Sequence, residues 1–130
     1  MISRRHILAA GAFAAALAVT PAMAGQRAGY TPAAFAAAQK AGKPILVEVH
    51  APWCPTCKAQ GPILSKLEAD PRFAGLTIFQ VDFDSQKDAL KALNAQKQST
   101  LIVFKGAKET GRSVGATDPA SIEELLEKTL

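Results

Sequence analysis

The chain contains only two cysteines, Cys54 and Cys57, and two residues separate them. They lie where one sequence pattern changes to another. Before them, residues 45–49 form a short apolar, β-branched run that predicts a strand buried on both faces. After them, apolar residues recur at helical spacing to about residue 69. The fold must therefore carry a buried strand into a helix across this pair, which places both thiols at a helix N-terminus.

Helical and strand patterns alternate over residues 25–130, without a repeat, linker or low-complexity stretch. The alternation predicts one α/β domain, in which a sheet is covered by helices on both faces. A chain of 130 residues, 48% hydrophobic and 20% charged, has room for one such domain. Besides the elements that flank the cysteines, we expect helices at 32–40, at 85–93 and from Asp118 and Pro119 onward, and strands at 76–83 and 100–105, the latter turning at Gly106 into 112–114.

The first 24 residues differ in composition from the rest of the chain. Arg4 and Arg5 precede an alanine-rich apolar run at 7–19, and small residues ending at Ala24 form a cleavage sequence. This order is typical of a secretory signal. The arginine pair and weakly hydrophobic run favour the twin-arginine route, with ordinary Sec export as one alternative. An uncleaved anchor is the other, although the run is shorter than the roughly 20 residues that span a bilayer.

We therefore expect cleavage after residue 24, export to the periplasm, and a mature domain at residues 25–130 with no membrane span. The full chain has a formal net charge of +4. Loss of Arg4 and Arg5, the only charged residues in the signal, leaves the mature domain weakly basic. Its lysines and arginines are scattered among acidic residues, without the basic stripe that nucleic-acid binding requires. We expect no nucleic-acid partner.

The position of the cysteine pair predicts redox chemistry. Free N–H groups and the positive end of the helix dipole stabilise a thiolate at Cys54, so its pKa is expected below the ~8.5 of a free thiol. Cys57 lies about one turn further along the helix. We expect it to be too buried to react first but close enough to resolve a mixed disulfide on Cys54. The pair can then alternate between dithiol and disulfide.

Other uses of two cysteines fit the sequence less well. A structural disulfide across so short a loop would stabilise the fold little. A zinc site needs four ligands, and neither a second cysteine pair nor a close histidine pair is present, so no metal site is expected. Attachment of a c-type haem requires histidine directly after the second cysteine, where this chain has Lys58.

Residues 45–58, ILVEVHAPWCPTCK, resemble the strand, active-site loop and helix start of the thioredoxin family. The similarity covers nearly all of residues 30–130 and continues at 61–64, 81–84, 100–106 and 114–116. It implies a thioredoxin fold, with a central mixed sheet flanked by helices on both faces. It also implies a protein-disulfide oxidoreductase with no cofactor beyond the redox-active disulfide of Cys54 and Cys57. The implied partners are exported proteins with cysteines or disulfides, and a membrane or periplasmic redox protein.

The resemblance also implies roles for residues around the cysteines. Glu48 occupies the family's position for a carboxylate beneath the active site, where it helps to move the proton of the buried cysteine. A buried charge is costly unless it serves such a purpose, and the alternative is an exposed glutamate on a less buried strand. Trp53 and Pro55, together with Ser99 and Thr100, are the expected substrate-binding residues. His50 is expected to pack and not to act as a catalyst.

Ser99 departs from the family, which has a cis-proline before the residue equivalent to Thr100. The Gln98–Ser99 bond is expected to be either trans in a rearranged loop or cis under strain, because a non-proline cis bond costs ~2.5–4 kcal/mol. Ser99 could add a hydrogen-bond donor near Cys54, slow the release of mixed disulfides or admit a metal. The alternative is a simple replacement with a modest loss of rate. If the loop faces Cys54, Ser99→Pro is expected to raise turnover.

The direction of electron flow is less constrained, since Pro55 occurs in both oxidising and reducing relatives. We favour reduction, which requires an outside electron source in an oxidising compartment. The alternative hypothesis is that the protein is a binding protein and not an enzyme. Its cysteine pair would then hold Cu(I) or retain one thiol partner with little turnover.

Overall fold

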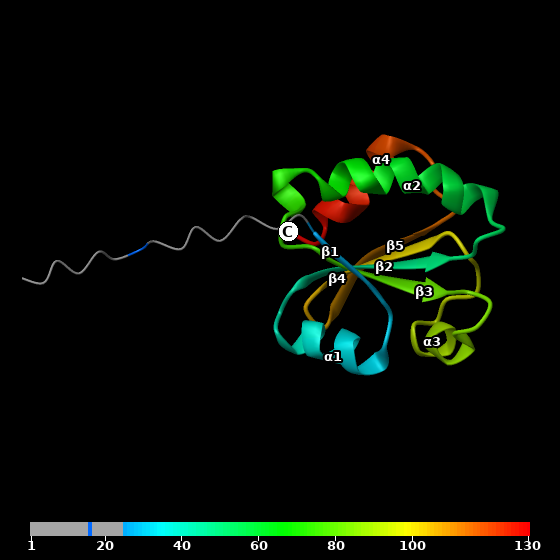
Figure 1. The fold of residues 1–130 in the computed structure, drawn as a ribbon, viewed down its shortest axis with the longest axis horizontal. Coiled ribbons are helices and arrows are strands. Elements are labelled where there is room, and N and C mark those ends of the chain that lie inside the picture. The colour runs from blue at the N-terminus through cyan, green and yellow to red at the C-terminus, as the bar shows by residue number, and fades with distance from the viewer. Residues whose placement is uncertain (1–15, 17–24) are drawn as a thin grey trace, which may run out of the picture.

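The computed structural model describes residue 16 and residues 25–130, so the expected signal lies outside the described residues except for residue 16. Within residues 25–130, strands and helices alternate (Figure 1). No helix in the described part is long and apolar enough to cross a membrane. The elements are β1 (Gln26–Gly29), α1 (Pro32–Lys40), β2 (Pro44–His50), α2 (Pro55–Glu68), the 3-10 helix η1 (Pro71–Phe73), β3 (Thr77–Asp82), α3 (Lys87–Ala92), β4 (Thr100–Lys105), β5 (Lys108–Val114) and α4 (Pro119–Glu127).

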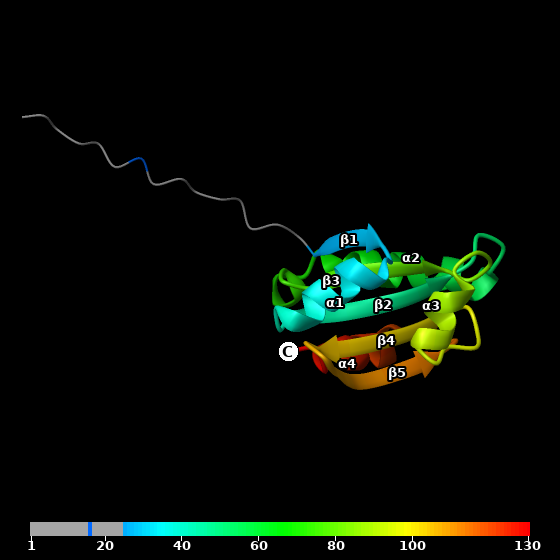
Figure 2. The same cartoon turned by 90° about the horizontal axis from the view of Figure 1, so that it is seen from below.

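The five strands form one mixed sheet in the order β1-β3-β2-β4-β5. β3 pairs in parallel with β1 and β2, whereas β4 runs antiparallel to β2 and β5 antiparallel to β4. β1 and β5 are therefore the two edges, as the second view shows (Figure 2). Helices α1 and α3 cover one face and α2 and α4 the other (Figure 1). The expected α/β domain with a mixed sheet is confirmed.

β2 lies in the centre of the sheet and carries the chain to the cysteines. Its residues Ile45, Val47 and Val49 pack in the core beneath α1 and α3, and Leu46 packs in the core beneath α2 and α4. The prediction of a strand buried on both faces is confirmed. Because side chains alternate along a strand, Glu48 shares the α2 face with Leu46. A carboxylate therefore enters the core on the side of the helix that begins at the cysteines.

Local sequence signals account for the helix starts. The Thr31 hydroxyl accepts a hydrogen bond from the Ala34 N–H at 3.1 Å and caps α1. A carboxylate oxygen of Asp118 accepts from the Ser121 N–H at 3.0 Å and caps α4. Hydrogen bonds from Ser121 also hold the pKa of Asp118 below its usual value. Each of these helices has proline at its first position, as expected.

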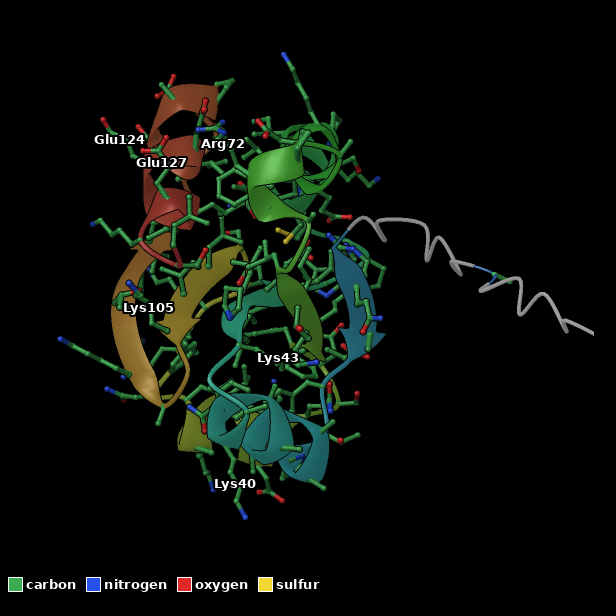
Figure 3. All side chains as sticks on the ribbon, turned by 90° about the vertical axis from the view of Figure 1, so that its left-hand side faces the viewer. Lys40, Lys43, Arg72, Lys105, Glu124 and Glu127 are labelled. Atoms are coloured by element: carbon green, nitrogen blue, oxygen red, sulfur yellow. The ribbon has the colours of Figure 1, made fainter. Side chains whose placement is uncertain are left out.

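Three features were not expected from the sequence. β1 adds an edge strand whose four residues are exposed and pair with β3 through the backbone, so no apolar pattern indicates it. β5 begins at Lys108 and not at residue 112. η1 places Arg72 beside α4, where the guanidinium pairs with Glu127 and two further carboxylates (Figure 3). This network is solvent-exposed, so it fixes geometry more than it adds stability.

Candidate active site

Cys54 is the cap of α2. The chain leaves β2 and turns, with the Cys54 N–H donating to the Ala51 carbonyl at 3.2 Å, and Pro55 opens the helix from an exposed position. The Cys54 sulfur accepts a hydrogen bond from the Cys57 N–H at 3.1 Å. This places sulfur where a capping oxygen normally lies, against the free N–H groups and the positive end of the helix dipole.

Cys57 lies one turn along the same helix, and both thiols are free. Its sulfur is 4.0 Å from the carbonyl oxygen of Val49 in β2. Burial raises the pKa of the Cys57 thiol, and its hydrogen bond with Cys54 raises it further. The neutral thiol is therefore favoured at Cys57, which agrees with the predicted order in which Cys54 attacks and Cys57 resolves; the two roles stay a prediction.

The greater burial expected for Cys57 is not found in the structure. Cys57 was expected to react second because of its burial, yet Cys54 is 1% exposed and Cys57 is 3% exposed. Solvent exposure of the whole residue therefore does not distinguish the two cysteines. What differs is the hydrogen bond that the Cys54 sulfur accepts at the helix terminus, and the pKa of Cys57, which desolvation and the neighbouring Cys54 raise.

Trp53 provides an exposed apolar surface next to the buried sulfurs. The side chain is 54% exposed, and its indole N–H donates to an Asp84 carboxylate oxygen at 2.9 Å. The ring meets Phe83 edge to face with centroids 6.2 Å apart, and Phe83 packs against the cluster formed by Ala51, Cys54 and Cys57. Sequence reasoning did not single out Phe83 and Asp84, which follow β3. The sequence signal for them is an aromatic and an acidic residue directly after β3. Because β3 runs parallel to β2, these residues lie at the same end of the sheet as the end of β2.

Glu48 is buried, at 4% exposed, so the alternative of an exposed glutamate is wrong. Its carboxylate pairs with Arg27 of β1, and the same guanidinium pairs with Glu68 near the end of α2. Burial by itself lowers the pKa of Arg27. The hydrogen bonds to Glu68 and Glu48 raise it by more, so the pKa of Arg27 lies above its usual value. Arg27 therefore compensates the buried charge. The proton-transfer role of Glu48 stays a prediction, and no sequence signal pointed to Arg27.

Replacing Arg27 with glutamine is expected to lower the free energy of unfolding by ~1–3 kcal/mol, because it leaves the Glu48 carboxylate buried without its cation. The effect is smaller than for a fully buried pair, since Arg27 is partly solvated. Glu68→Gln is the matched control, because it removes one carboxylate of Arg27 and keeps the buried pair. Urea unfolding measures both. Equal stability of the two variants would contradict the importance of the Arg27–Glu48 pair.

The Ser99 loop adopts the rearranged trans form. No cis peptide bond occurs among the described residues, and Ser99 has φ +56°, in the left-handed region. The Ser99 N–H donates to the Val49 carbonyl at 2.8 Å, and its hydroxyl donates to the Gln98 carbonyl at 2.6 Å. Both donors of Ser99 therefore bond to backbone carbonyls, and the possibility that Ser99 adds a donor near Cys54 gains no support. The buried Thr100 hydroxyl likewise bonds within the loop, to the Lys97 carbonyl at 2.7 Å, and its role in substrate binding stays a prediction.

The metal-binding hypothesis gains no further ligand from the structure. Within the part of the chain that the structure describes, no three His, Cys, Asp or Glu side chains come together in a group that could hold a metal ion. The arrangement that the side chains do form, a helix-capping sulfur with a protonated thiol one turn away, suits thiol–disulfide exchange.

Comparisons with known proteins agree with this chemistry. A sequence model of the thioredoxin family matches residues 28–128. Thioredoxin from Chlamydia trachomatis serovar D is 37% identical over 84 residues, which cover 65% of this chain and 80% of that protein. The crystal structure of Trxlp from Edwardsiella tarda EIB202 is 42% identical, with a TM-score of 0.76 over 78% of this chain and 98% of that chain. Malassezia sympodialis thioredoxin, 22% identical, shares the fold with a TM-score of 0.69 over 80% of this chain and 91% of its own. The chain belongs to the thioredoxin family, with its thioredoxin fold and its thiol:disulfide oxidoreductase activity.

Proposed function

We propose that this protein is exported to the periplasm and there reduces disulfides of other exported proteins. The surroundings of the cysteine pair support this direction of electron flow, from the protein to its partner. Both sulfurs are buried among apolar side chains, and burial raises the pKa of Cys57. Strong oxidants of this fold owe their potential to a stabilised reduced form. The raised pKa of Cys57 keeps this sulfur protonated, so Cys57 adds no thiolate stabilisation to the reduced form, which supports a reductant.

The proposed reaction proceeds in two exchanges. The Cys54 thiolate attacks one sulfur of the partner's disulfide, forms a mixed disulfide and releases the partner's other sulfur, which takes up a proton. Cys57 then loses its proton and attacks the Cys54 sulfur, which releases the second partner thiol and leaves the Cys54–Cys57 disulfide. Two electrons and two protons pass to the partner. A membrane or periplasmic redox protein restores the dithiol, and no organic cofactor takes part. Trp53 and Pro55 present the surface on which the partner docks.

The reduction potential of the Cys54–Cys57 pair tests the direction. We expect a value near that of thioredoxin, about −270 mV, measured by equilibration in thiol–disulfide buffers with alkylation of the free thiols. Cys57→Ser serves as the control, because it cannot form the internal disulfide. A value near −120 mV, typical of the strong oxidant of this fold, would reverse the proposed direction and leave the exchange chemistry in place.

Export by the twin-arginine route is tested by changing Arg4 and Arg5 to lysine together. Lysine retains the charge but lacks the planar guanidinium, so we expect the periplasmic fraction to fall several-fold and the uncleaved precursor to accumulate. Cell fractionation and the mass of the exported chain measure both. Changing only Arg27 to lysine, in the mature domain, is the control. Normal export of the double variant would contradict the twin-arginine route and favour Sec.

A further inference from the structure

Gln60 is a fully buried polar residue on α2, three positions after Cys57. Its side-chain NH₂ donates to two backbone carbonyls, that of Ser99 at 3.2 Å and that of Ala116 at 2.9 Å. Because both neighbours are acceptors, only the NH₂ end of the amide can face them. A single side chain of the active-site helix therefore holds two loops, one before β4 and one after β5.

The amide oxygen of Gln60 is buried and has no hydrogen-bond partner. An unsatisfied buried acceptor costs free energy, typically about 1–3 kcal/mol. Methionine is similar in length and would avoid this cost, so helix packing alone does not favour glutamine at this position. What glutamine adds is its pair of N–H donors. Their role is therefore to be found at the carbonyls that they bind.

The carbonyl of Ser99 is the more informative of the two. It accepts from Gln60 and also from the Gly115 N–H at 3.0 Å, while the Ser99 N–H donates to Val49. These bonds hold a residue with a side chain at φ +56°, a conformation that costs roughly 1–2 kcal/mol relative to the right-handed region. The Val49 carbonyl oxygen that accepts from the Ser99 N–H also lies 4.0 Å from the Cys57 sulfur.

We propose that Gln60 is a positioning residue that fixes the left-handed Ser99 loop and, through the Ser99 backbone, sets how readily the Cys57 thiol ionises to resolve the mixed disulfide. Burial is the largest influence on the pKa of Cys57 and raises it, and Cys54 raises it further, while the backbones of Ala51 and Ser99 act in the opposite direction. Release of the loop removes the contribution of Ser99 and leaves that of Ala51. This inference rests on exchange at Cys54 and Cys57, and it is independent of export and of the direction of electron flow.

Gln60→Met removes the donors at nearly constant size and tests the proposal. In a Cys54→Ser background, where Cys57 is the only thiol, we expect the midpoint of its thiolate absorbance titration to move to higher pH. With both cysteines present, resolution of a preformed mixed disulfide at neutral pH is expected to slow about 3- to 10-fold, in step with the smaller thiolate fraction. Leu64→Met, one turn further along the buried face of α2, is the control and is expected to change neither quantity.

A second substitution tests whether Gln60 acts through Ser99. Glycine adopts positive φ readily, so adding Ser99→Gly to Gln60→Met is expected to restore much of the lost resolution rate. A folded Gln60→Met protein with unchanged Cys57 titration and unchanged resolution would overturn the proposal. A loss of rate that Ser99→Gly does not recover would overturn the route through Ser99.

The native protein provides a test that requires no substitution. The Gln60 side chain is fully buried and its NH₂ group donates to the buried Ser99 carbonyl and to the partly buried Ala116 carbonyl, so its NMR signals are expected to exchange with water far more slowly than those of exposed amides. Rapid exchange would show that Gln60 does not hold the Ser99 and Ala116 loops, and it would overturn the proposal even if Gln60→Met fails to fold. If the native protein showed slow exchange of these groups but no disulfide turnover, the proposed function would fail while the hydrogen bonds of Gln60 to the two loops would stand. The two outcomes are therefore distinguishable.

Discussion

Cys54→Ser is expected to reduce disulfide exchange by on the order of 10³-fold or more, because the variant lacks the nucleophile that begins the reaction. Insulin-disulfide reduction with a thiol donor measures the loss. Serine can still occupy the cap of α2, since its hydroxyl oxygen accepts the hydrogen bond that the Cys54 sulfur accepts from Cys57. The fold should therefore persist, and unfolding curves of the variant check this.

Cys57→Ser is the matched variant and is expected to fail at the other step. Its Cys54 attacks once, and the mixed disulfide then accumulates because no thiol is present to resolve it. Gel electrophoresis without reductant detects that species. In the native protein an alkylating agent at neutral pH should label Cys54 first, since burial raises the pKa of Cys57. Faster labelling of Cys57 would reverse the assigned roles.

Ser99→Pro is expected to lower the free energy of unfolding by about 3 kcal/mol and to slow disulfide turnover. Proline cannot adopt the φ of +56° found at Ser99, and it lacks the N–H that bonds to Val49. The sequence-based expectation of faster turnover depended on a loop that faces Cys54 and takes the cis geometry that proline favours, whereas the structure has a trans, left-handed Ser99. Urea unfolding and insulin reduction measure the two effects.

Ser99→Gly is the control for backbone conformation. Glycine suits the positive φ and keeps the N–H, so its stability should stay within about 1 kcal/mol of the native protein. Ser99→Ala keeps the strained backbone and loses only the hydroxyl bond to Gln98. If Ser99→Pro were as stable as Ser99→Gly and turned over faster, the trans left-handed loop would not be the functional form.

The sequence by itself determined the cysteine chemistry and most of the secondary structure. Strand β2, the helix that begins at the cysteines, and the starts of α1 and α4 were all predicted. These features depend on residues a few positions apart, such as the caps Thr31 and Asp118, each followed by proline. The apolar run that predicted β2 is equally local, and the structure buries that strand on both faces of the sheet.

Only the tertiary structure decided which polar groups meet. Arg27 reaches Glu48 across 21 positions of sequence, and Gln60 reaches the Ser99 carbonyl across 39. β1 likewise becomes a strand only because β3 offers it a backbone edge. No local pattern encodes such contacts, since a buried charge or amide is stabilised by whichever partner the packed sheet and helices bring to it. The same packing holds Ser99 in a left-handed conformation that its own backbone preference disfavours.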